Sequence, residues 1–199
     1  LNTDGVIDEQ DRTVIGNPMP DFQYGFSNRF FYKNFDLSIF INGNYGNKIF
    51  NQVRRQNEDP ASDFGMLESV FNYARLEPNS LDADVDEVVV TNPETTVPRI
   101  TTSDPNNNQR PSTRFIEDGT YLRIQNITLG YTLPINLASR FKLRNLRLYA
   151  SVENLHTFTS YSGYDPEIGS QTSDPLLMGI DNGRYPSPRI FTLGINIGL

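Results

Sequence analysis

The sequence contains no cysteine, no tryptophan and a single histidine, His156, among 199 residues. Without cysteine the chain forms no disulfide bond and has no thiolate to bind a metal or attack a substrate. With one histidine, catalysis by a histidine-based triad is nearly excluded. We therefore expect His156 to lie at a strand end near the surface, and we expect the chain not to be an enzyme.

Long apolar runs are also missing. No stretch of about 18 apolar residues occurs, so no transmembrane helix is predicted, and no signal peptide is visible. The chain opens at Leu1 inside what reads as a loop motif, so we expect a C-terminal piece of something longer. The net charge of -7 argues against a nucleic-acid-binding protein, which normally carries a basic stripe.

Aromatic residues are plentiful by contrast. They make up 12% of the chain, although only 37% of it is hydrophobic. Such a composition fits a membrane barrel wall, where only alternate strand residues meet lipid. It fits a secreted β-sandwich equally well, so composition alone does not decide between the two.

The last nine residues, Phe191–Leu199, alternate strictly between large apolar side chains and Thr, Gly or Asn. Such a strand is either half-buried in a soluble sheet or part of a barrel between lipid and a wet lumen. Segment 21–43 repeats the pattern on both sides of Lys33 and Asn34, which we expect to form a two-residue turn because Asn tolerates positive φ. This turn would pair Tyr32 with Phe35 and Phe26 with Ile41, so apolar side chains would share one face.

Two further strands are predicted within 115–158. In the first, Leu122 and Ile124 lie on the opposite parity from Ile127 and Leu129, which indicates a bulge near Gln125 or a strand end above the membrane. With the last strand at 188–199, five strands alternate between short turns and the long connections 44–114 and 159–187. A short helix is expected near 64–76. Short periplasmic turns and long extracellular loops are typical of outer-membrane barrels, and five strands need further strands to close one.

Several short motifs also occur in a fixed order. They are NTDGVID (2–8), IGNPMP (15–20), YKNFDLS (32–38), FIEDGTYLR (115–123), TLGYTLP (128–134), ENL (153–155), YSGYDPE (161–167) and YP (185–186). Together they resemble the C-terminal part of the SusC/RagA-like TonB-dependent transporters of Bacteroidota outer membranes. The resemblance covers nearly the whole chain and thins within 52–110.

This resemblance implies all-β architecture: the last five strands or so of an antiparallel transmembrane barrel of about 22 strands that encloses a plug domain. The plug would lie outside this chain. Implied partners are a SusD-like surface lipoprotein acting as a lid, the TonB-ExbB-ExbD complex acting through the missing N-terminal part, the rest of the barrel and outer-membrane lipid. The implied function is import of oligosaccharides or peptides. The terminal Leu199 departs from the aromatic residue with which such barrels usually end.

Residues 1–20 would form an extracellular loop that contains a candidate calcium motif. Oxygen ligands at alternate positions around a glycine suit a hard cation. The candidate ligands are Asn2, Asp4, Val6, Asp8 and Asp11, with Gly5 at the bend. The last of them is Asp rather than the usual bidentate Glu. The alternative is a metal-free turn that stabilises the loop.

Three tyrosines, Tyr161, Tyr164 and Tyr185, are candidates for contact with substrate or lid, or else they pack the loops. Asp165 and Glu167 have the spacing of a carboxylate pair, but the transporter resemblance explains their motif better than glycosidase chemistry does. Wall ion pairs or plug contacts are expected from the polar face, which carries Arg29, Asp36, Arg147 and Glu153. The alternative to the importer is a secreted, calcium-stabilised β-sandwich that serves in binding or adhesion.

Overall fold

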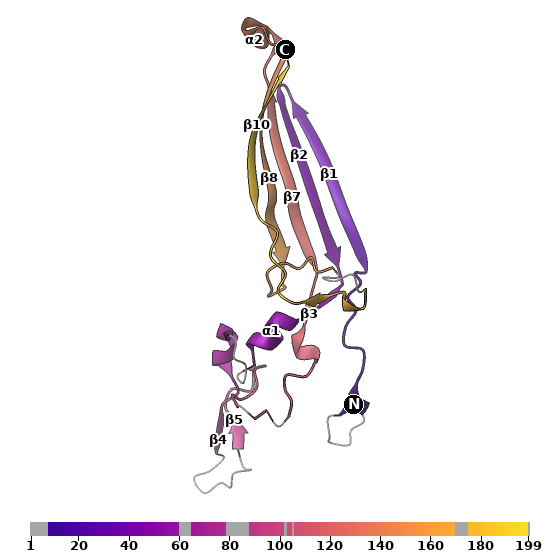
Figure 1. Cartoon of the computed structure of the whole chain (residues 1–199), viewed down its shortest axis with the longest axis vertical. Helices are drawn as coiled ribbons and strands as arrows, with labels where there is room; N and C mark the ends of the chain where they lie inside the picture. The colour runs from indigo at the N-terminus through magenta and orange to yellow at the C-terminus, as the bar shows by residue number, and fades with distance from the viewer. Residues whose placement is uncertain are drawn as a thin grey trace.

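The computed structural model describes residues 8–59, 65–78, 88–101, 103–104, 106–169 and 175–198. Its dominant feature is an antiparallel sheet of five strands in the spatial order β1-β2-β7-β8-β10. These strands are β1 (Phe22–Tyr32), β2 (Phe35–Tyr45), β7 (Tyr121–Thr132), β8 (Asn145–Thr159) and β10 (Ile190–Gly198). Each strand therefore lies beside the next long strand of the sequence, as in a meander (Figure 1).

The first hairpin has the predicted register. Tyr32 pairs with Phe35 and Phe26 with Ile41, so both strands present most of their apolar residues to one face. Phe31 and Phe40 are the exceptions, since they pair with Asp36 and Ser27 on the other face. The turn differs from the prediction in one respect, because Lys33 rather than Asn34 has the positive φ, of 52°. The Asn34 side chain instead donates a hydrogen bond to the carbonyl of Thr132, 2.8 Å away on β7. Asn34 thus joins the turn to the neighbouring strand.

A bulge interrupts β7 at the predicted place. Asn126 pairs with Phe40 and Ile124 with Ile41, which leaves Gln125 as the extra residue. The pairing of β7 with β8 shifts at the same point. The bulge explains why the apolar parity of β7 changes there, and it turns Arg123 toward the same face as Asp36.

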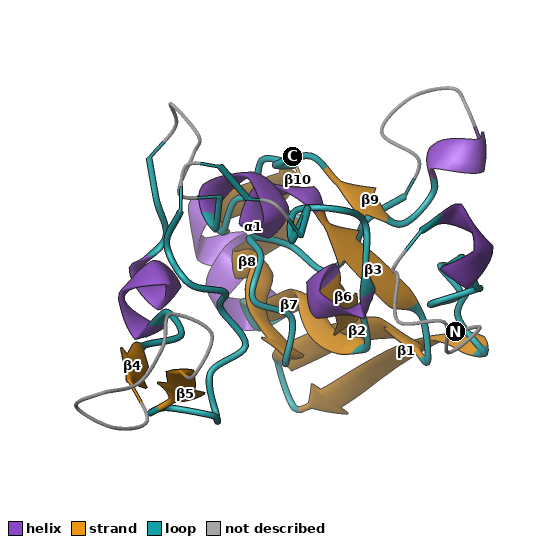
Figure 2. Cartoon of the chain, turned by 90° about the horizontal axis from the view of Figure 1, so that it is seen from below, coloured by secondary structure: helices purple, strands orange, loops and turns teal. Residues whose placement is uncertain are grey.

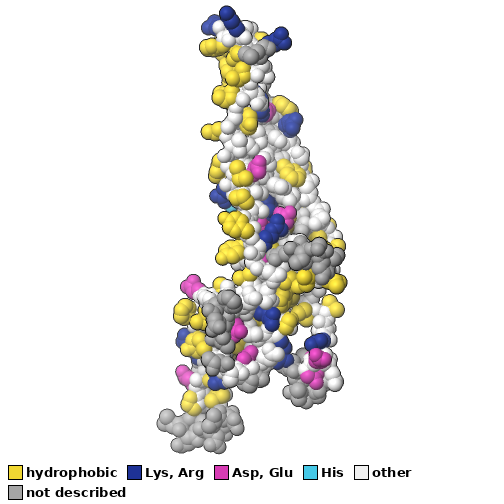
Figure 3. All heavy atoms as spheres, in the orientation of Figure 1, with side chains coloured by type: hydrophobic (Ala, Val, Ile, Leu, Met, Phe, Trp, Pro, Cys, Tyr) yellow, Lys and Arg dark blue, Asp and Glu magenta, His cyan; other side chains and the backbone are white. Residues whose placement is uncertain are grey.

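The two faces of the sheet differ sharply in polarity. Strongly exposed apolar side chains cover one face, where Leu193 is 86% and Phe191 is 73% exposed, and no second sheet covers these strands in the part of the chain that the structure describes. Other exposed members of this face are Phe22, Phe26, Phe30, Tyr32, Phe35, Leu129, Leu148, Ile195 and Ile197. Hydrophobic side chains form a column along the sheet in Figure 3. A soluble β-sandwich would bury this face, so the arrangement argues against that alternative.

The two ends of the sheet differ as well. One end carries the Lys33–Asn34 turn and the connection from β7 to β8, which contains α2 (Ile135–Ala138) and a 3₁₀ turn, η4 (Ser139–Phe141) (Figure 1). We call this the short-turn end. All the long connections lie at the opposite end, here called the loop end, together with the segment before β1.

A small folded layer covers the loop end (Figure 2). Its three-stranded sheet consists of β6 (Ile116–Asp118), β3 (Lys48–Asn51) and β9 (Ile180–Asp181), in that order. It buries Ile49 and Phe115 completely. Nearby elements are α1 (Gln52–Asn57), η3 (Thr113–Phe115) and η5 (Pro175–Leu177). The layer joins parts of both long loops, because β3 and β6 belong to the first and β9 to the second.

The rest of the first loop contains β4 (Leu76–Pro78) paired with β5 (Val88–Val90). The prediction of a helix near 64–76 is wrong in extent: only a short 3₁₀ helix, η2 (Glu68–Asn72), forms there, and Val70 is its one buried residue. Another 3₁₀ turn, η1 (Glu9–Asp11), precedes β1. No helix in the described ranges is long and apolar enough to cross a membrane.

Candidate functional site

The polar face of the sheet contains an ion pair that spans three strands. Arg147 on β8 donates two hydrogen bonds to the Asp36 carboxylate on β2, at 3.0 and 2.6 Å. Gly130 on β7 lies between them, and a Cβ atom there would come within 2.3 Å of Arg147 Nη2 and 2.4 Å of Asp36 Oδ1. The predicted wall ion pair therefore forms between these two residues. Arg29 and Glu153 make no ion pair with the residues that the structure describes.

Near the loop end, Arg123 fastens the second long loop to the polar face. Its guanidinium donates to Asp165 at 2.5 Å, to Glu167 at 2.7 Å and to the hydroxyl of Thr157 at 2.9 Å. Arg123 and Asp165 are 3% and 2% exposed. The carboxylate pair considered for glycosidase chemistry is thus engaged by one arginine, as expected of structural anchors.

The ionisation of Asp165 follows from these contacts. Burial opposes the charged form, but the backbone N–H groups of Glu167 and Ser187 and the Arg123 guanidinium stabilise it more strongly. The pKa of Asp165 therefore lies below its ordinary value of 3.8. The carboxylate stays ionised near neutral pH and keeps the loop attached.

Between this anchor and the segment before β1 lies a cavity of about 580 Å³, here called the mouth cavity. Its wall on the sheet carries Gln23, Asn42, Asn44 and Tyr121, which β-pairing places on neighbouring strands. The loops contribute the remaining side of the cavity. The loop residues are Pro18, Met19, Pro20, Asn47, Glu167, Ile168, Gly169 and Met178.

The three candidate tyrosines lie in different surroundings. Tyr161 is buried, and its hydroxyl donates a 2.6 Å hydrogen bond to Asp181. Burial and then this bond raise the pKa of Tyr161 above its ordinary value. This placement fits the alternative of loop packing. Tyr164 and Tyr185 are 73% and 85% exposed on the second loop, so their rings are free to meet a partner. His156 is exposed on β8, with its ring edge-on to Phe158.

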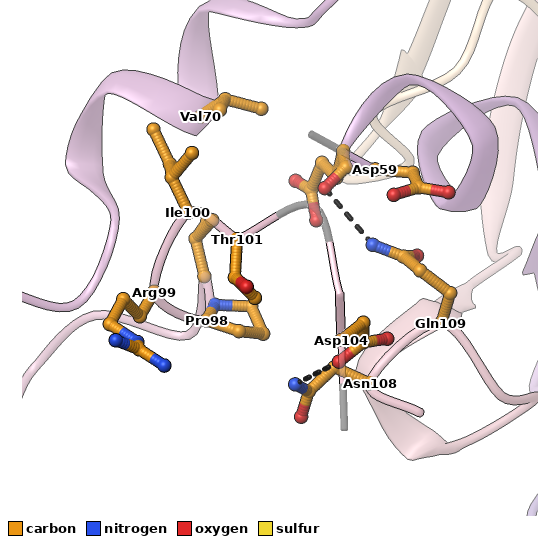
Figure 4. Close-up of a pocket in the computed structure, with 11 residues that line it drawn as sticks. Asp59, Val70, Pro98, Arg99, Ile100, Thr101, Asp104, Asn108 and Gln109 are labelled. Atoms are coloured by element: carbon orange, nitrogen blue, oxygen red, sulfur yellow. Dashed lines mark hydrogen bonds between the residues drawn. The ribbon is translucent and has the colours of Figure 1, made fainter. Parts of the chain in front are cut away.

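A buried carboxylate organises the first long loop. Glu58 is 1% exposed and accepts hydrogen bonds from Arg114 at 2.7 Å, Ser69 at 2.8 Å and Arg54 at 2.9 Å. A hollow beside it is lined by Val70, Ile100 and Gln109 (Figure 4). Its volume of about 10 Å³ holds one water at most, so it is no substrate site.

The calcium prediction stays a prediction. Asn2, Asp4 and Val6 lie outside the described residues. Asp8 accepts a hydrogen bond from the N–H of Gln10, and Asp11 accepts one from the N–H of Asp8, which together form a capping box on η1. The metal-free alternative predicts contacts of this kind, and each carboxylate keeps further acceptor positions. Among the described residues no group of three metal-ligating side chains comes together.

Sequence reasoning missed Arg123, Glu58 and the mouth cavity. Arg123 ends the motif at 115–123, which was used only for the family resemblance. Its neighbours in the sequence do not distinguish it from an arginine exposed to solvent. Glu58 sits in a connection that reads as polar and irregular. The one available indication was the change of parity in β7, since it implies that Arg123 faces the same way as Asp36.

Comparison with known proteins identifies the kind of protein to which this five-stranded sheet is similar. TonB-dependent receptor P3 of Formosa agariphila is 36% identical over 99% of this chain, and TonB-dependent receptor P39 of the same organism is 34% identical over 94%. TonB-dependent receptor SusC of Bacteroides thetaiotaomicron is 27% identical over 98% of it. The chain is a homologue of the TonB-dependent receptors. It spans only 17–18% of the length of these three relatives. No family model matches the chain.

Solved structures agree with the homology to TonB-dependent receptors. The RagAB peptide importer in its closed-closed state matches 92% of this chain with a TM-score of 0.69 and 23% identity, and the match covers 18% of that chain. Another structure of the RagAB peptide transporter matches 87% of this chain and 17% of its own length, with a TM-score of 0.63 and 25% identity. The predicted fold class is confirmed: the five long strands are a segment of a large antiparallel transmembrane β-barrel. The apolar face is accordingly the outer face of this receptor homologue, and the polar face lines its lumen.

Proposed function

We propose that this chain forms part of the wall and extracellular loops of a TonB-dependent outer-membrane importer. The importer takes up oligosaccharides or peptides together with a SusD-like surface lipoprotein, and this part of it performs no covalent chemistry. The observation that carries the proposal is the five-stranded sheet itself, whose outer face exposes a band of apolar side chains while its inner face is polar. Such a surface is stable against lipid and unfavourable in water.

The distribution of loops supports the same orientation. All the long connections gather at one end, where they build a folded layer with buried ion pairs, and the other end has short turns. In outer-membrane barrels the long loops are extracellular and the short turns periplasmic. We therefore assign the mouth cavity to the extracellular opening, where cargo enters.

For the lipoprotein lid, Tyr164 and Tyr185 are the contacts we propose. Both rings are exposed at the loop end, and tyrosine is enriched at protein interfaces because it buries a large area with a polar tip. TonB-ExbB-ExbD would act through segments of the receptor outside this chain. Calcium at Asn2, Asp4, Val6, Asp8 and Asp11 remains a further proposal for the loop before β1.

The test is extraction of the native protein from outer membranes with detergent, followed by mass spectrometry of the intact complex. We expect this sequence to be recovered as part of a chain several times longer, together with a surface lipoprotein. Cells that lack TonB should lose uptake of the cargo. Recovery of a monodisperse 22.6 kDa monomer without detergent would overturn the proposal.

A further inference from the structure

The short-turn end carries a basic surface that the proposed import function does not use. It comprises Lys33 and the connection 134–144, and we call it the basic tip. We propose that the basic tip binds the anionic headgroups of phospholipids in the periplasmic leaflet of the membrane. The proposal rests on the orientation assigned above, in which the short-turn end faces the periplasm.

The side chains of the basic tip carry charge of one sign. Lys33, Arg140, Lys142 and Arg144 are all exposed. None of the four forms an ion pair with a residue that the structure describes. Lys and Arg side chains gather at the top of Figure 3, which is the short-turn end. A concentration of positive charge at one end of the sheet indicates an anionic partner.

Carboxylates that could neutralise these cations are scarce. No Asp or Glu occurs in 119–152, although the whole chain has a net charge of -7. Asp36 lies close to Lys33 in the sequence, but its carboxylate accepts two hydrogen bonds from Arg147 on the polar face. The positive charge of the basic tip therefore stays available to a partner.

A row of aromatic side chains marks the level of the membrane surface. Tyr32 pairs with Phe35 and Phe35 with Tyr131, which places all three on the apolar face in the last row before the turn. The ring centroids of Phe35 and Tyr131 are 4.7 Å apart. Aromatic girdles of this kind lie at the membrane–water interface. Lys33 Nζ lies 5.3 Å from the centroid of the Tyr32 ring, so the basic tip begins at the depth of the headgroups.

Apolar side chains continue beyond the aromatic row. Phe141 is 69% exposed, Ile135 is 68% exposed and Leu137 is 43% exposed. In Figure 3 hydrophobic side chains extend from the column on the sheet to the short-turn end, where they meet the Lys and Arg side chains. Apolar residues beside cations are typical of segments that bind a membrane surface. Continuity with the lipid-facing side of the sheet favours lipid over a periplasmic protein as the occupant.

The backbone of the basic tip is held in place by its own hydrogen bonds. The N–H groups of Leu137 and Ala138 donate to the carbonyl of Pro134, at 2.9 and 3.0 Å. The N–H of Arg144 donates to the carbonyl of Gly198 at 2.9 Å, which ties the connection to β10. Ala138 is completely buried. A site that is already ordered loses less conformational entropy on binding.

The first experiment uses the full-length receptor purified with its lipoprotein in a neutral detergent. Native mass spectrometry measures the binding of phosphatidylglycerol and of phosphatidylcholine with the same acyl chains, so that only the headgroup differs. The variant removes three cations of the basic tip, by Arg140→Gln, Lys142→Gln and Arg144→Gln. The control removes the same charge from exposed arginines at the loop end, by Arg12→Gln, Arg75→Gln and Arg99→Gln.

We expect the wild type to bind phosphatidylglycerol roughly tenfold more tightly than phosphatidylcholine, because each cation near an anionic surface adds to the attraction. The variant should lose most of this preference, and the control should keep it. Equal binding of the two lipids by the wild type overturns the proposal. An equal loss of preference in variant and control overturns it as well, since the charge of the basic tip would then have no special role.

A second measurement tests whether the basic tip enters the membrane. A spin label is attached through Phe141→Cys or, as the control at the loop end, through Phe71→Cys, in the full-length receptor cleared of other cysteines and placed in vesicles that contain phosphatidylglycerol. Phe71 is 78% exposed. We expect oxygen to reach the label at position 141 and a water-soluble nickel chelate to be excluded from it, because oxygen concentrates in the apolar part of a membrane.

The label at position 71 should be open to the nickel chelate. Equal access of the chelate to both labels overturns the membrane placement and leaves a periplasmic protein as the occupant. Neither measurement depends on transport. TonB-dependent uptake is scored separately, so failure of the lipid site and failure of the importer proposal remain distinguishable.

Discussion

At the scale of single residues, Arg123 attaches the second long loop to the sheet through a buried ion pair. It places one buried guanidinium between two carboxylates that lie 42 and 44 positions away in the sequence. Removing one partner of a buried pair leaves the other charge without compensation, which typically costs about 3–5 kcal/mol. This cost would fall on the loop, because the strand itself keeps its backbone hydrogen bonds.

We therefore predict that Arg123→Met releases the loop around Asp165 and leaves the barrel intact. Hydrogen exchange of residues 160–169 in the full-length receptor should rise by two orders of magnitude or more. The matched control is Arg29→Met, which removes an exposed arginine of the same face that pairs with no described residue. Equal exchange in the two variants would contradict the anchoring role.

The low pKa of Asp165 gives the same attachment a pH dependence. A carboxyl group whose pKa is lower in the folded state stabilises that state above its unfolded pKa, and the contribution disappears as pH falls through the folded pKa. Loop protection should therefore be constant near neutrality and should decline only below pH 3.8. Protease cleavage of the loop measured against pH would check this. In Asp165→Asn, protection should be low throughout and independent of pH in that range.

The ion pair between Asp36 and Arg147 requires glycine at position 130, because the two side chains meet directly above Gly130 and leave no room for a Cβ atom. We predict that Gly130→Ala displaces this pair and lowers barrel stability by about 1 kcal/mol, the order expected of a partly exposed ion pair. The measurement is the temperature at which the folded band is lost in a gel-shift assay. Gly65→Ala is the control, since a Cβ atom there meets nothing within 4 Å. Equal melting of the two variants would refute the steric argument.

At the scale of elements, strands were predictable from sequence and the loop layer was not. Period-two alternation fixes which residues share a face, and the apolar pairs then fix the register of β1 with β2 and the bulge in β7. By contrast, β3, β6 and β9 are four residues long or shorter and pair across more than 60 positions. Their existence depends on buried contacts such as those of Ile49, which no local periodicity reveals.

The turn between β1 and β2 shows a smaller failure of the same kind. Intrinsic preference assigns the positive φ to Asn34. In the structure the Asn34 side chain instead donates a hydrogen bond to the carbonyl of Thr132 on β7, and Lys33 has the positive φ, of 52°.

We predict that Lys33→Gly raises the unfolding free energy of the barrel by up to about 1 kcal/mol. Urea titration of the folded barrel would measure it. Lys142→Gly, at φ 57°, should behave alike, whereas a loss of stability in both would contradict the strain argument.

At the scale of the whole molecule, the two faces of the sheet must meet different solvents. A soluble protein covers an apolar face of this size with a second layer, while a barrel leaves it to lipid. Neighbouring residues of β10 test the assignment directly, because Leu193 pairs with Ala150 on the apolar face and Thr192 pairs with Ser151 on the polar face.

Arginine at these two positions should therefore have opposite consequences. Leu193→Arg places a charge in the lipid band and should cost about 2–4 kcal/mol near the bilayer midplane, so less folded receptor should reach the outer membrane. Thr192→Arg projects into the wet lumen and should assemble almost normally. The amount of heat-modifiable receptor in outer-membrane fractions measures both. Equal loss in the two variants would mean that β10 does not separate lipid from lumen, and the orientation of the entire sheet would have to be reversed or abandoned.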